Sequence, residues 1–337
     1  MSLMIGIALL GGCAQNQGGT NQGGIIQGGI NQAGMTQAVA GTVNESQGEY
    51  PYTFTDSAGE NVTLTARPER VAVLFSSYAD VWKAAGGEIY VTVGESVERG
   101  FAPEDVLLVD QGAGKTIDNE LLVSYEPDFV ICSADIAAQN ETAELLKEAG
   151  IPCASFRVEC LDEYLYMLKI CSDITGDGEA FRRSGTEVKE RSDRILNQTA
   201  KQEEKRKILF IRSGSGESSA KAKTAELHFA AAMLEELGTC NIADNAPVLL
   251  DGLSLEEILK EDPDYIFIST MGKEEAARAY MDSVLADSAW QALSAVQEGR
   301  VNYLPKDLFQ FKPNARWDEA YEYLAEILYP ELDVNEK

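Results

Sequence analysis

Two stretches of this chain decide its fold. Residues 120–131 read Glu-Leu-Leu-Val-Ser-Tyr-Glu-Pro-Asp-Phe-Val-Ile, and residues 256–267 read Glu-Glu-Ile-Leu-Lys-Glu-Asp-Pro-Asp-Tyr-Ile-Phe. Both begin with glutamate, place Pro-Asp at the same distance behind it, and continue into an apolar run. Because a residue before proline is pushed out of the helical region, each copy predicts a helix, a proline stop and a buried strand. One supersecondary unit in each half of the chain predicts two similar lobes.

Short apolar runs alternate with amphipathic stretches around both copies. The runs that predict strands are residues 70–75, 89–93, 106–109, 128–132, 153–156, 207–211, 265–269 and 300–304. The stretches that predict helices are residues 78–85, 119–125, 141–149 and 314–329. This alternation predicts an α/β fold whose mainly parallel sheets are covered by helices on both faces.

A highly charged stretch lies between the two halves. Within residues 177–206, Phe181, Val188 and Ile195 follow one another every seven residues and form a narrow apolar stripe on one long helix. Three such layers are too few to hold a coiled-coil dimer, so we expect a single bridging helix. The predicted domains are an N-terminal α/β lobe at 50–176, the bridging helix at 177–206 and a C-terminal α/β lobe at 207–337.

The first 13 residues resemble a bacterial lipoprotein signal. Residues 1–10 are uncharged and mostly apolar, and Leu10-Gly11-Gly12-Cys13 resembles a lipobox, in which Cys13 is lipidated after cleavage. Residues 14–49 repeat Gln, Gly and Asn and bury too little apolar area to offset chain entropy. They predict a disordered tether, with a short-period solenoid as the alternative. We expect the folded body outside the cell, held to the outer face of the cytoplasmic membrane by its lipid.

The composition limits the classes of partner. The 337 residues include 28 basic and 55 acidic side chains, for a net charge of −27. Such a surface repels phosphate backbones and anionic headgroups, so we expect a monomer without nucleic-acid binding and without membrane contact beyond the lipid anchor. Five cysteines remain after Cys13, scattered and without a C-x-x-C pair. An odd remainder argues against a disulfide framework and against structural zinc, and predicts free thiols.

Six segments carry a resemblance to a known family. They are residues 52–64, 67–71, 145–152, 174–176, 237–244 and 290–301. As an ordered series they resemble the periplasmic-binding-protein family for iron complexes, haem and cobalamin, over about residues 50 to 330. The resemblance implies two Rossmann-like lobes joined by one long helix, a ligand in the cleft between them, and little movement on closure. It also implies no enzymatic activity, no intrinsic cofactor, and delivery of the ligand to an ABC permease with its ATPase.

The same resemblance assigns a role to the repeated glutamates. Proteins of this family dock on their permease through one glutamate on each lobe, and the matching positions here are Glu120 and Glu256. The alternative is that each is a first-turn glutamate that only stabilises its helix through the helix dipole.

Residues that follow the predicted strands are the candidates for ligand binding, because open parallel sheets bind ligands outside the carboxyl ends of their strands. They are Ser77, Tyr78, Arg157, Arg212, Met271, Phe309, Lys312 and Arg316. Cations and aromatic rings on so acidic a protein predict a flat or conjugated ligand with negative charge. His228, the only histidine, could ligate haem iron, although a lone histidine in a helical stretch more often faces core or solvent.

These observations predict capture of a ferric siderophore-type iron(III) chelate, with a corrinoid (cobalamin) or haem in the same fold as the alternative. Ala113 stands where the haem-specialised branch carries a ligating tyrosine, which disfavours haem. One histidine also excludes the His-rich cages that hold bare zinc or manganese.

Two motifs suggest other activities but are incomplete. Residues 114–116 resemble the end of a phosphate-binding loop, but Val109 stands where that loop needs glycine. Residues 213–216 resemble a nucleophile elbow, but Ser213 stands where that turn needs glycine. A hydrolase needs a nucleophile–base pair beside an oxyanion site, and none can be assembled from the sequence. A surface adhesin, which would need a large exposed apolar patch, stays open at this point.

Overall fold

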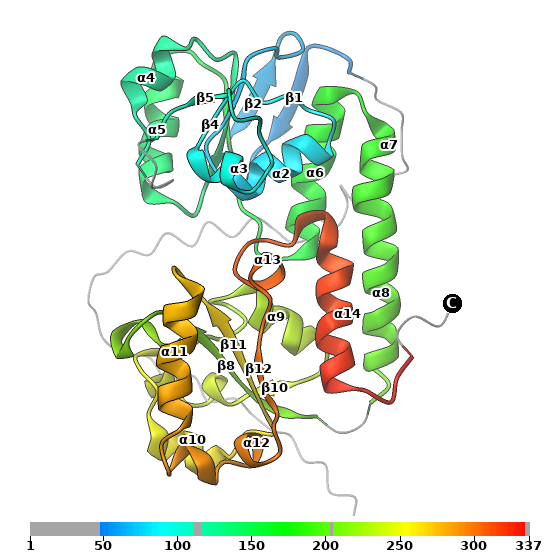
Figure 1. The fold of residues 1–337 in the computed structure, drawn as a ribbon. Helices are drawn as coiled ribbons and strands as arrows, with labels where there is room; N and C mark the ends of the chain where they lie inside the picture. The colour runs from blue at the N-terminus through cyan, green and yellow to red at the C-terminus, as the bar shows by residue number, and fades with distance from the viewer. Residues whose placement is uncertain (1–47, 111–115, 203–204, 334–337) are drawn as a thin grey trace, which may run out of the picture.

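The computed structural model describes residues 48–110, 116–202 and 205–333. The expected lipoprotein signal with Cys13, and nearly all of the expected tether, lie outside these described residues. Within them the chain forms two α/β lobes, one above the other in Figure 1, with helices running along one side of both. The predicted two-lobe α/β fold is confirmed.

A five-stranded parallel sheet forms the first lobe, in the order β5-β4-β3-β6-β7. Its strands are β3 (Val71–Val73), β4 (Val91–Thr92), β5 (Leu107–Leu108), β6 (Phe129–Ser133) and β7 (Cys153–Phe156). The connecting helices are α2 (Ser76–Ala84), α3 (Gly94–Glu98), α4 (Asn119–Ser124) and α5 (Ala137–Glu148). Every strand predicted in this half is present, and several are shorter than the apolar run, because residues such as Val93 and Val109 are buried beyond the ladder.

An antiparallel hairpin precedes this sheet and was not predicted. It pairs β1 (Tyr52–Thr55) with β2 (Asn61–Leu64), and its buried and exposed residues alternate as expected for a sheet with one covered face. In its turn, the Asp56 carboxylate accepts a hydrogen bond of 2.8 Å from the Ser155 amide of β7. The hairpin therefore covers the outer edge of the first sheet.

The second lobe repeats the parallel arrangement with an antiparallel addition. The strands β10 (Cys240–Asn241), β8 (Lys207–Ser213), β11 (Tyr265–Thr270) and β12 (Val301–Tyr303) lie in that order. β9 (Lys221–Ala222) pairs antiparallel with the end of β8 and sets Lys221 beside Arg212. Its helices are α9 (Phe229–Glu236), α10 (Leu255–Glu261), α11 (Glu274–Leu285), α12 (Ser294–Gln297) and α13 (Lys306–Phe309).

The sequence repeat has the same structure in both lobes. α4 leads through Pro127 into β6, and α10 leads through Pro263 into β11, so both copies end in an inner strand of their sheet. The residue before each proline leaves the helical region, as predicted, but adopts the left-handed rather than the extended conformation, with φ of 50° at Glu126 and 43° at Asp262.

The aspartate of each Pro-Asp pair then fixes the neighbouring strand. The Asp128 carboxylate accepts a hydrogen bond of 2.8 Å from the Arg70 amide just before β3. The Asp264 carboxylate accepts one of 2.7 Å from the Lys207 amide at the start of β8. The repeat therefore sets the pairing of two inner strands in each lobe.

The helix expected at 177–206 is interrupted and ends early. It consists of α7 (Gly178–Phe181), a π-helical turn (Arg182–Thr186) and α8 (Glu187–Thr199), which together we call the spine. At Gly185 in the π-turn, a Cβ atom would stand 3.1 Å from Leu168 and 3.2 Å from Phe181, so a larger residue would require these side chains to give way by a few tenths of an ångström. The Tyr164 hydroxyl donates to the Ser184 carbonyl at 2.7 Å, which satisfies one backbone group in the widened turn.

Two further helices lie beside the spine and join the lobes (Figure 1). They are α6 (Leu161–Thr175), which was not predicted, and α14 (Trp317–Leu328), which begins after a short 3-10 turn instead of at residue 314. The largest apolar core runs without a break from Phe129 of the first sheet through Trp317 to Phe267 of the second. Because packed cores resist deformation, a shared core permits little movement between the lobes. In the described part of the chain, no helix combines the length and apolar character needed to cross a bilayer.

Candidate functional site

The carboxyl ends of the two parallel sheets face each other where the lobes meet. Lys312, which follows β12 and α13, lies with its Nζ 2.5 Å from a carboxylate oxygen of Glu159, which follows β7. The Asn314 side-chain amide donates to the Ser77 carbonyl at 2.7 Å, just after β3. Open α/β folds bind ligands at such strand ends. We call this region the strand-end site.

The first lobe contributes carboxylates to the strand-end site. Asp135 follows β6, and Glu159 and Glu163 follow β7; we call these three residues the acidic wall. Burial raises the pKa of Asp135 and of Glu163, and the neighbouring Glu159 raises both further. Arg157 lies 3.6 Å from Asp135 and offsets part of this charge, and the Glu163 carboxylate accepts from the Glu159 amide at 2.6 Å.

The second lobe contributes cations. Arg212 ends β8, Lys221 lies beside it on β9, Lys223 follows β9, and Lys312 follows α13; we call these four residues the basic wall. All four are partly buried. The pKa of Lys223 is lowered, first by burial and then by Arg212 and Lys221, so these cations lie close enough to repel one another.

A neutral histidine lies behind the basic wall. His228 is 7% exposed, and its ring centroid stands 4.9 Å from that of Phe210 and 4.8 Å from that of Phe229. Its Nδ1 accepts a hydrogen bond of 3.1 Å from the Ala230 amide and so caps α9. Burial lowers its pKa well below the ordinary value of 6.5, and Arg212, Lys312 and Lys223 lower it further.

The hydrogen bond to Nδ1 bears on whether His228 can ligate haem iron. A neutral imidazole whose Nδ1 accepts a hydrogen bond carries its own proton on Nε2, so neither nitrogen offers a free lone pair in this conformation. In the described conformation the single histidine caps α9, and because it is neutral it adds no charge to the basic wall.

Lys312 is the point where the two walls meet. Its side chain is 14% exposed, and its Nζ lies 4.9 Å from the centre of the Phe229 ring. Besides its ion pair with Glu159, it lowers the pKa of Asp135 on the first lobe and of His228 on the second. Its charge therefore acts on both sides of the strand-end site.

A second contact between the lobes was not predicted. The Arg99 guanidinium donates to the Ser76 and Ser77 hydroxyls at 2.9 and 3.1 Å, and its Cζ lies 3.9 Å from the centre of the Phe311 ring. The Lys306 ammonium lies 5.3 Å from the same ring. Phe311 stands between Phe309 and Lys312, two of the candidates named from the sequence, but nothing near Arg99 in the sequence reveals a partner so distant along the chain.

Three predicted ligand contacts are packed inside the protein instead. Tyr78 is 1% exposed and its hydroxyl donates to the Phe156 carbonyl at 2.9 Å. Phe309 is fully buried, and Ser77 is 1% exposed and accepts from Arg99. All three do follow strands, as predicted. Their side chains point into the core because the helices that begin there turn one face inward, which strand position alone does not reveal.

The other predicted contacts lie at or near the surface. Arg212 and Lys312 come together around His228, and Arg157 lies beside Asp135. Met271 follows β11 and is 37% exposed. Arg316 is exposed and pairs with Glu319 at 2.8 Å and with Asp307 at 3.7 Å. Sequence reasoning missed Lys221 and Lys223, whose signal is a pair of cations in the short segment that follows β8.

Glu120 and Glu256 occupy equivalent positions on the two lobes. Each is exposed and lies in the first turn of its helix, α4 or α10. Both are therefore accessible to a partner, and both also suit the helix dipole, so the two interpretations of these residues stay open.

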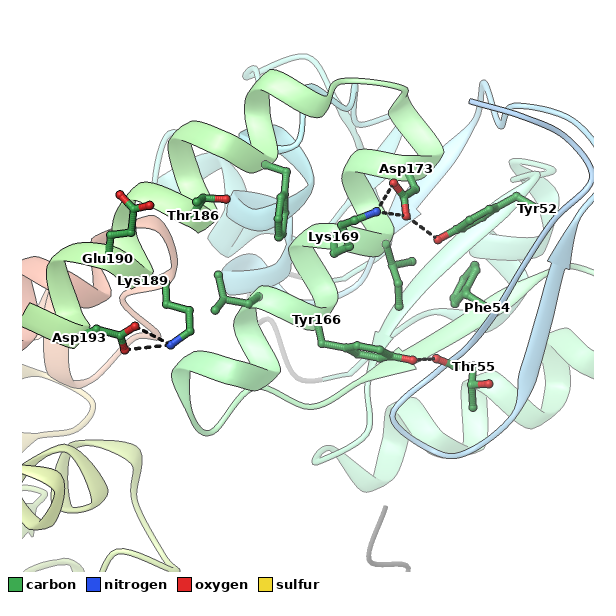
Figure 2. Close-up of a pocket in the computed structure, with 13 residues that line it drawn as sticks. Tyr52, Phe54, Thr55, Tyr166, Lys169, Asp173, Thr186, Lys189, Glu190 and Asp193 are labelled. Atoms are coloured by element: carbon green, nitrogen blue, oxygen red, sulfur yellow. Dashed lines mark hydrogen bonds and ion pairs between the residues drawn. The ribbon is translucent and has the colours of Figure 1, made fainter. Parts of the chain in front are cut away.

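A cavity of about 450 Å³, whose lining residues are drawn in Figure 2, involves none of the strand-end residues. It lies between β1, α6 and the spine. Lys169 pairs with Asp173 at 2.6 Å, Lys189 pairs with Asp193 at 2.8 Å, and the Tyr52 hydroxyl donates to Asp173 at 3.1 Å. Both lysines that line this cavity are thus paired with carboxylates of its wall, so, within the part of the chain described, it has no group of unpaired cations like that of the strand-end site. We therefore place the candidate site at the strand ends.

Among the described residues, no three His, Cys, Asp or Glu side chains gather as they would around a metal ion. The strand-end site thus consists of a basic wall, an acidic wall and the Lys312–Glu159 pair between them. Such a site can hold an anion by charge and hydrogen bonds.

Comparison with known proteins gives a consistent result. Residues 71–308 match the family described as periplasmic binding protein. The chain is 25% identical, over 84% of its length and 87% of the relative's, to the uncharacterised ABC transporter substrate-binding lipoprotein YvrC of Bacillus subtilis. Its fold resembles the crystal structure of the vitamin B12-binding protein BtuF of Vibrio cholerae, with a TM-score of 0.64 and 22% identity over 80% of this chain and 99% of that one. It also resembles the siderophore-binding protein BauB, solved with acinetobactin and ferric iron, with a TM-score of 0.64 and 14% identity over 82% and 98%.

Proposed function

This chain belongs to the periplasmic binding protein family, and on that premise we propose that it is the substrate-binding component of an ABC importer that captures an anionic, ferric siderophore-type chelate between its lobes. One observation carries the proposal: a protein of net charge −27 gathers four cations at the strand ends. Like charges held together cost free energy unless an anion joins them.

Among the described residues, three of these four cations lack an internal ion-pair partner, which supports the binding of an anion from outside the protein. Lys312 has Glu159 as its partner, whereas Arg212, Lys221 and Lys223 form no ion pair within the described ranges. They are partly buried, so water screens them less than it screens an exposed lysine. An iron(III) chelate that keeps net negative charge on its oxygen atoms matches three such donors, and the partly buried Phe311 supplies an aromatic ring nearby.

A corrinoid is the second candidate, because the similar Vibrio cholerae protein is named as vitamin B12-binding. Haem is a weaker one, because the His228 tautomer leaves no nitrogen to ligate iron. We expect no enzymatic activity, in keeping with relatives that serve transporters.

A melting experiment with a ligand panel tests the proposal. Purified protein is heated with an anionic ferric siderophore, an uncharged ferric siderophore, cobalamin or hemin. We expect the anionic chelate to raise Tm by several degrees, since ligand at about 100 times Kd stabilises by about 2.7 kcal/mol. Lys223→Met should lose most of this shift, and Lys147→Met, on exposed α5, should keep it. Absence of any shift with all four ligands would overturn the proposal.

Uptake by cells tests the docking role. We propose that Glu120 and Glu256 contact the permease, as the family resemblance implies. The variant with both Glu120→Arg and Glu256→Arg should block uptake of the bound chelate while binding in solution is unchanged. The control reverses Glu144 and Glu275, which are exposed on α5 and α11. If uptake survives the first pair of changes, docking uses other residues.

We further propose that Cys13 is lipidated and that the protein is held outside the cytoplasmic membrane. Cells grown with a clickable palmitate analogue should label the wild-type chain and leave Cys13→Ala unlabelled, with that variant released to the medium or periplasm. Labelling of the variant at the wild-type level would contradict this anchor.

A further inference from the structure

Two cysteines lie side by side in the first sheet. The sulfur atoms of Cys132 on β6 and Cys153 on β7 stand 3.4 Å apart, although the two residues are 21 positions apart in the sequence. Both are free thiols. An odd number of scattered cysteines predicts no pair, and only the pairing of β6 with β7 brings these two together.

The two thiols differ in access. Cys132 is fully buried in the apolar cluster beneath the sheet, and Cys153 packs against the same cluster at its margin and is partly exposed. A reagent from solvent therefore meets Cys153 first. Once Cys153 carries a mixed disulfide, Cys132 is positioned to attack it, because the two cysteine sulfur atoms are already in contact.

The backbone around the two cysteines allows a disulfide to form only with strain. Cys153 lies beside Val130 and Cys132 beside Ser155, so the cysteines are diagonal neighbours. Diagonal neighbours in a sheet stand about 7–8 Å apart, at or beyond the Cα separation that a disulfide normally spans. β7 is the edge strand of its sheet, and the turn of the hairpin is hydrogen-bonded to it through Asp56 and Ser155, so closure has to shift β7 together with this turn. Strained disulfides are the ones that are easily reduced again.

We propose that Cys132 and Cys153 form a reversible disulfide, a modification site made by thiol–disulfide exchange with a small-molecule disulfide. The Cys153 thiolate attacks one sulfur of that molecule, which forms a mixed disulfide and releases one thiolate. Cys132 loses its proton and attacks the Cys153 sulfur, which forms the internal bond and releases the second thiolate. Two protein thiols are oxidised, one disulfide is reduced to two thiols, and the protons go to the released thiolates.

The second step is the slow one. The neighbouring thiol and burial both raise the pKa of Cys132, so its thiolate is scarce at neutral pH. The mixed disulfide on Cys153 should therefore accumulate before the internal bond forms, and higher pH should speed its conversion.

The bond would act on the strand-end site. β7 ends at Phe156 and leads directly into Arg157 and Glu159, the partner of Lys312. A covalent link from β6 to β7 holds the base of this segment in place. The redox state of the pair thus bears on the acidic wall without touching a ligand.

Mass spectrometry of the full-length chain tests the proposal. Reduced protein is incubated with oxidised glutathione, its remaining thiols are alkylated, and it is digested without reductant. We expect one peptide pair linked through Cys132 and Cys153 and lacking the mass of two hydrogen atoms, and we expect dithiothreitol to remove the link. Cys132→Ser should stop at glutathione on Cys153, and Cys171→Ala, a buried cysteine of α6, should still form the link.

Two results would overturn the proposal. One is wild-type protein that keeps glutathione on Cys153 without forming the linked peptides, which would show that the strands cannot approach. The other is a wild-type chain whose Cys132 and Cys153 stay unmodified while exposed Cys240 reacts.

Discussion

The second lobe gives the strand-end site a basic wall, and the first lobe gives it an acidic wall. The two walls occupy equivalent places at the ends of similar parallel sheets. Acid acts on their surroundings in opposite ways, because Asp135 and Glu163 of the acidic wall have raised pKa values and lose charge early, whereas His228 behind the basic wall has a lowered pKa and resists gaining charge. The basic wall is therefore the constant feature of the site, and the acidic wall is the adjustable one.

This difference indicates that the two walls have separate roles. Glu159 already neutralises one cation, Lys312, and holds the lobes together in the absence of a ligand. Arg212, Lys221 and Lys223 keep their charge available to an anion. Two lobes of similar fold thus carry opposite charge at their strand ends, and the predictions below test whether these charges have separate roles.

The largest effect is expected where hydrogen bonds of Asn314 tie the two lobes together. Asn314 is fully buried, donates to the Ser77 carbonyl and to the Asp80 carboxylate at 2.7 and 2.9 Å, and has a left-handed φ of 51°. Asn314→Ala leaves a buried carboxylate without this donor and places alanine in a strained conformation. We expect the free energy of unfolding to fall by about 3 kcal/mol in urea titrations.

A glycine variant separates the two causes. Asn314→Gly loses the same hydrogen bonds but tolerates the left-handed backbone, so it should be about 1 kcal/mol more stable than Asn314→Ala. A loss under about 1 kcal/mol for both variants would mean that the lobes are held together elsewhere.

The next effect concerns the ion pair between the walls. Lys312→Glu faces Glu159 with a like charge and removes a cation from the basic wall, so affinity for an anionic ferric chelate should fall at least about tenfold, or about 1.4 kcal/mol. The double variant Lys312→Glu with Glu159→Lys restores an ion pair across the lobes but leaves the cation on the wrong wall. Isothermal titration calorimetry should show that it recovers thermal stability and not affinity. Full recovery of affinity would mean that the side of the cation does not matter.

Much of this architecture could be predicted, because the relevant signals are local. Pro127 and Pro263 stop helices wherever they occur, and the apolar runs that follow them have no stable place except inside a sheet. The gathering of Arg212 with Lys312 was predictable for a related reason, since strand ends in a parallel sheet share one edge. Such inferences need a strand position and no knowledge of distant partners.

The features that the sequence did not reveal depend on the orientation of a side chain or on contacts between residues far apart in the chain. Tyr78 and Phe309 follow strands as predicted, yet their rings turn into the core. Arg99 meets Phe311 only after both lobes have formed, and Cys132 meets Cys153 only after β6 and β7 pair. The β1 hairpin shows a regular alternation that the sequence does display, and it was noticed only as part of a family resemblance.

A smaller effect on stability is expected from the titration of His228, which lies behind the basic wall. The folded-state pKa of His228 lies below its ordinary value of 6.5, so the unfolded chain binds its proton more readily. The stability that His228 contributes is present above pH 6.5 and is lost as pH falls toward the folded-state pKa, by at most about 1.4 kcal/mol per pH unit. His228→Asn keeps a side-chain acceptor for the Ala230 amide and cannot titrate. Urea titrations from pH 7.5 to 5 should therefore show a flatter dependence for the variant, and parallel curves would contradict a neutral buried histidine.

The smallest effect is expected from the acidic wall, with the opposite sign. Asp135 has a folded-state pKa above its ordinary value of 3.8, so the folded chain binds its proton more readily than the unfolded chain. Its contribution to stability is present below pH 3.8 and is lost as pH rises through the folded-state pKa. Asp135→Asn removes this term and a 3.6 Å ion pair with Arg157 whose side chains are 40% and 52% exposed, so stability at pH 7 should change by no more than about 0.5 kcal/mol. As pH falls toward 3.8, the wild-type protein should become more stable relative to Asp135→Asn. Below pH 6.5, it should become less stable relative to His228→Asn. If both variants diverge from wild type in the same direction, the two walls do not respond oppositely to acid, and a fixed basic wall facing an adjustable acidic one is the wrong description of this site.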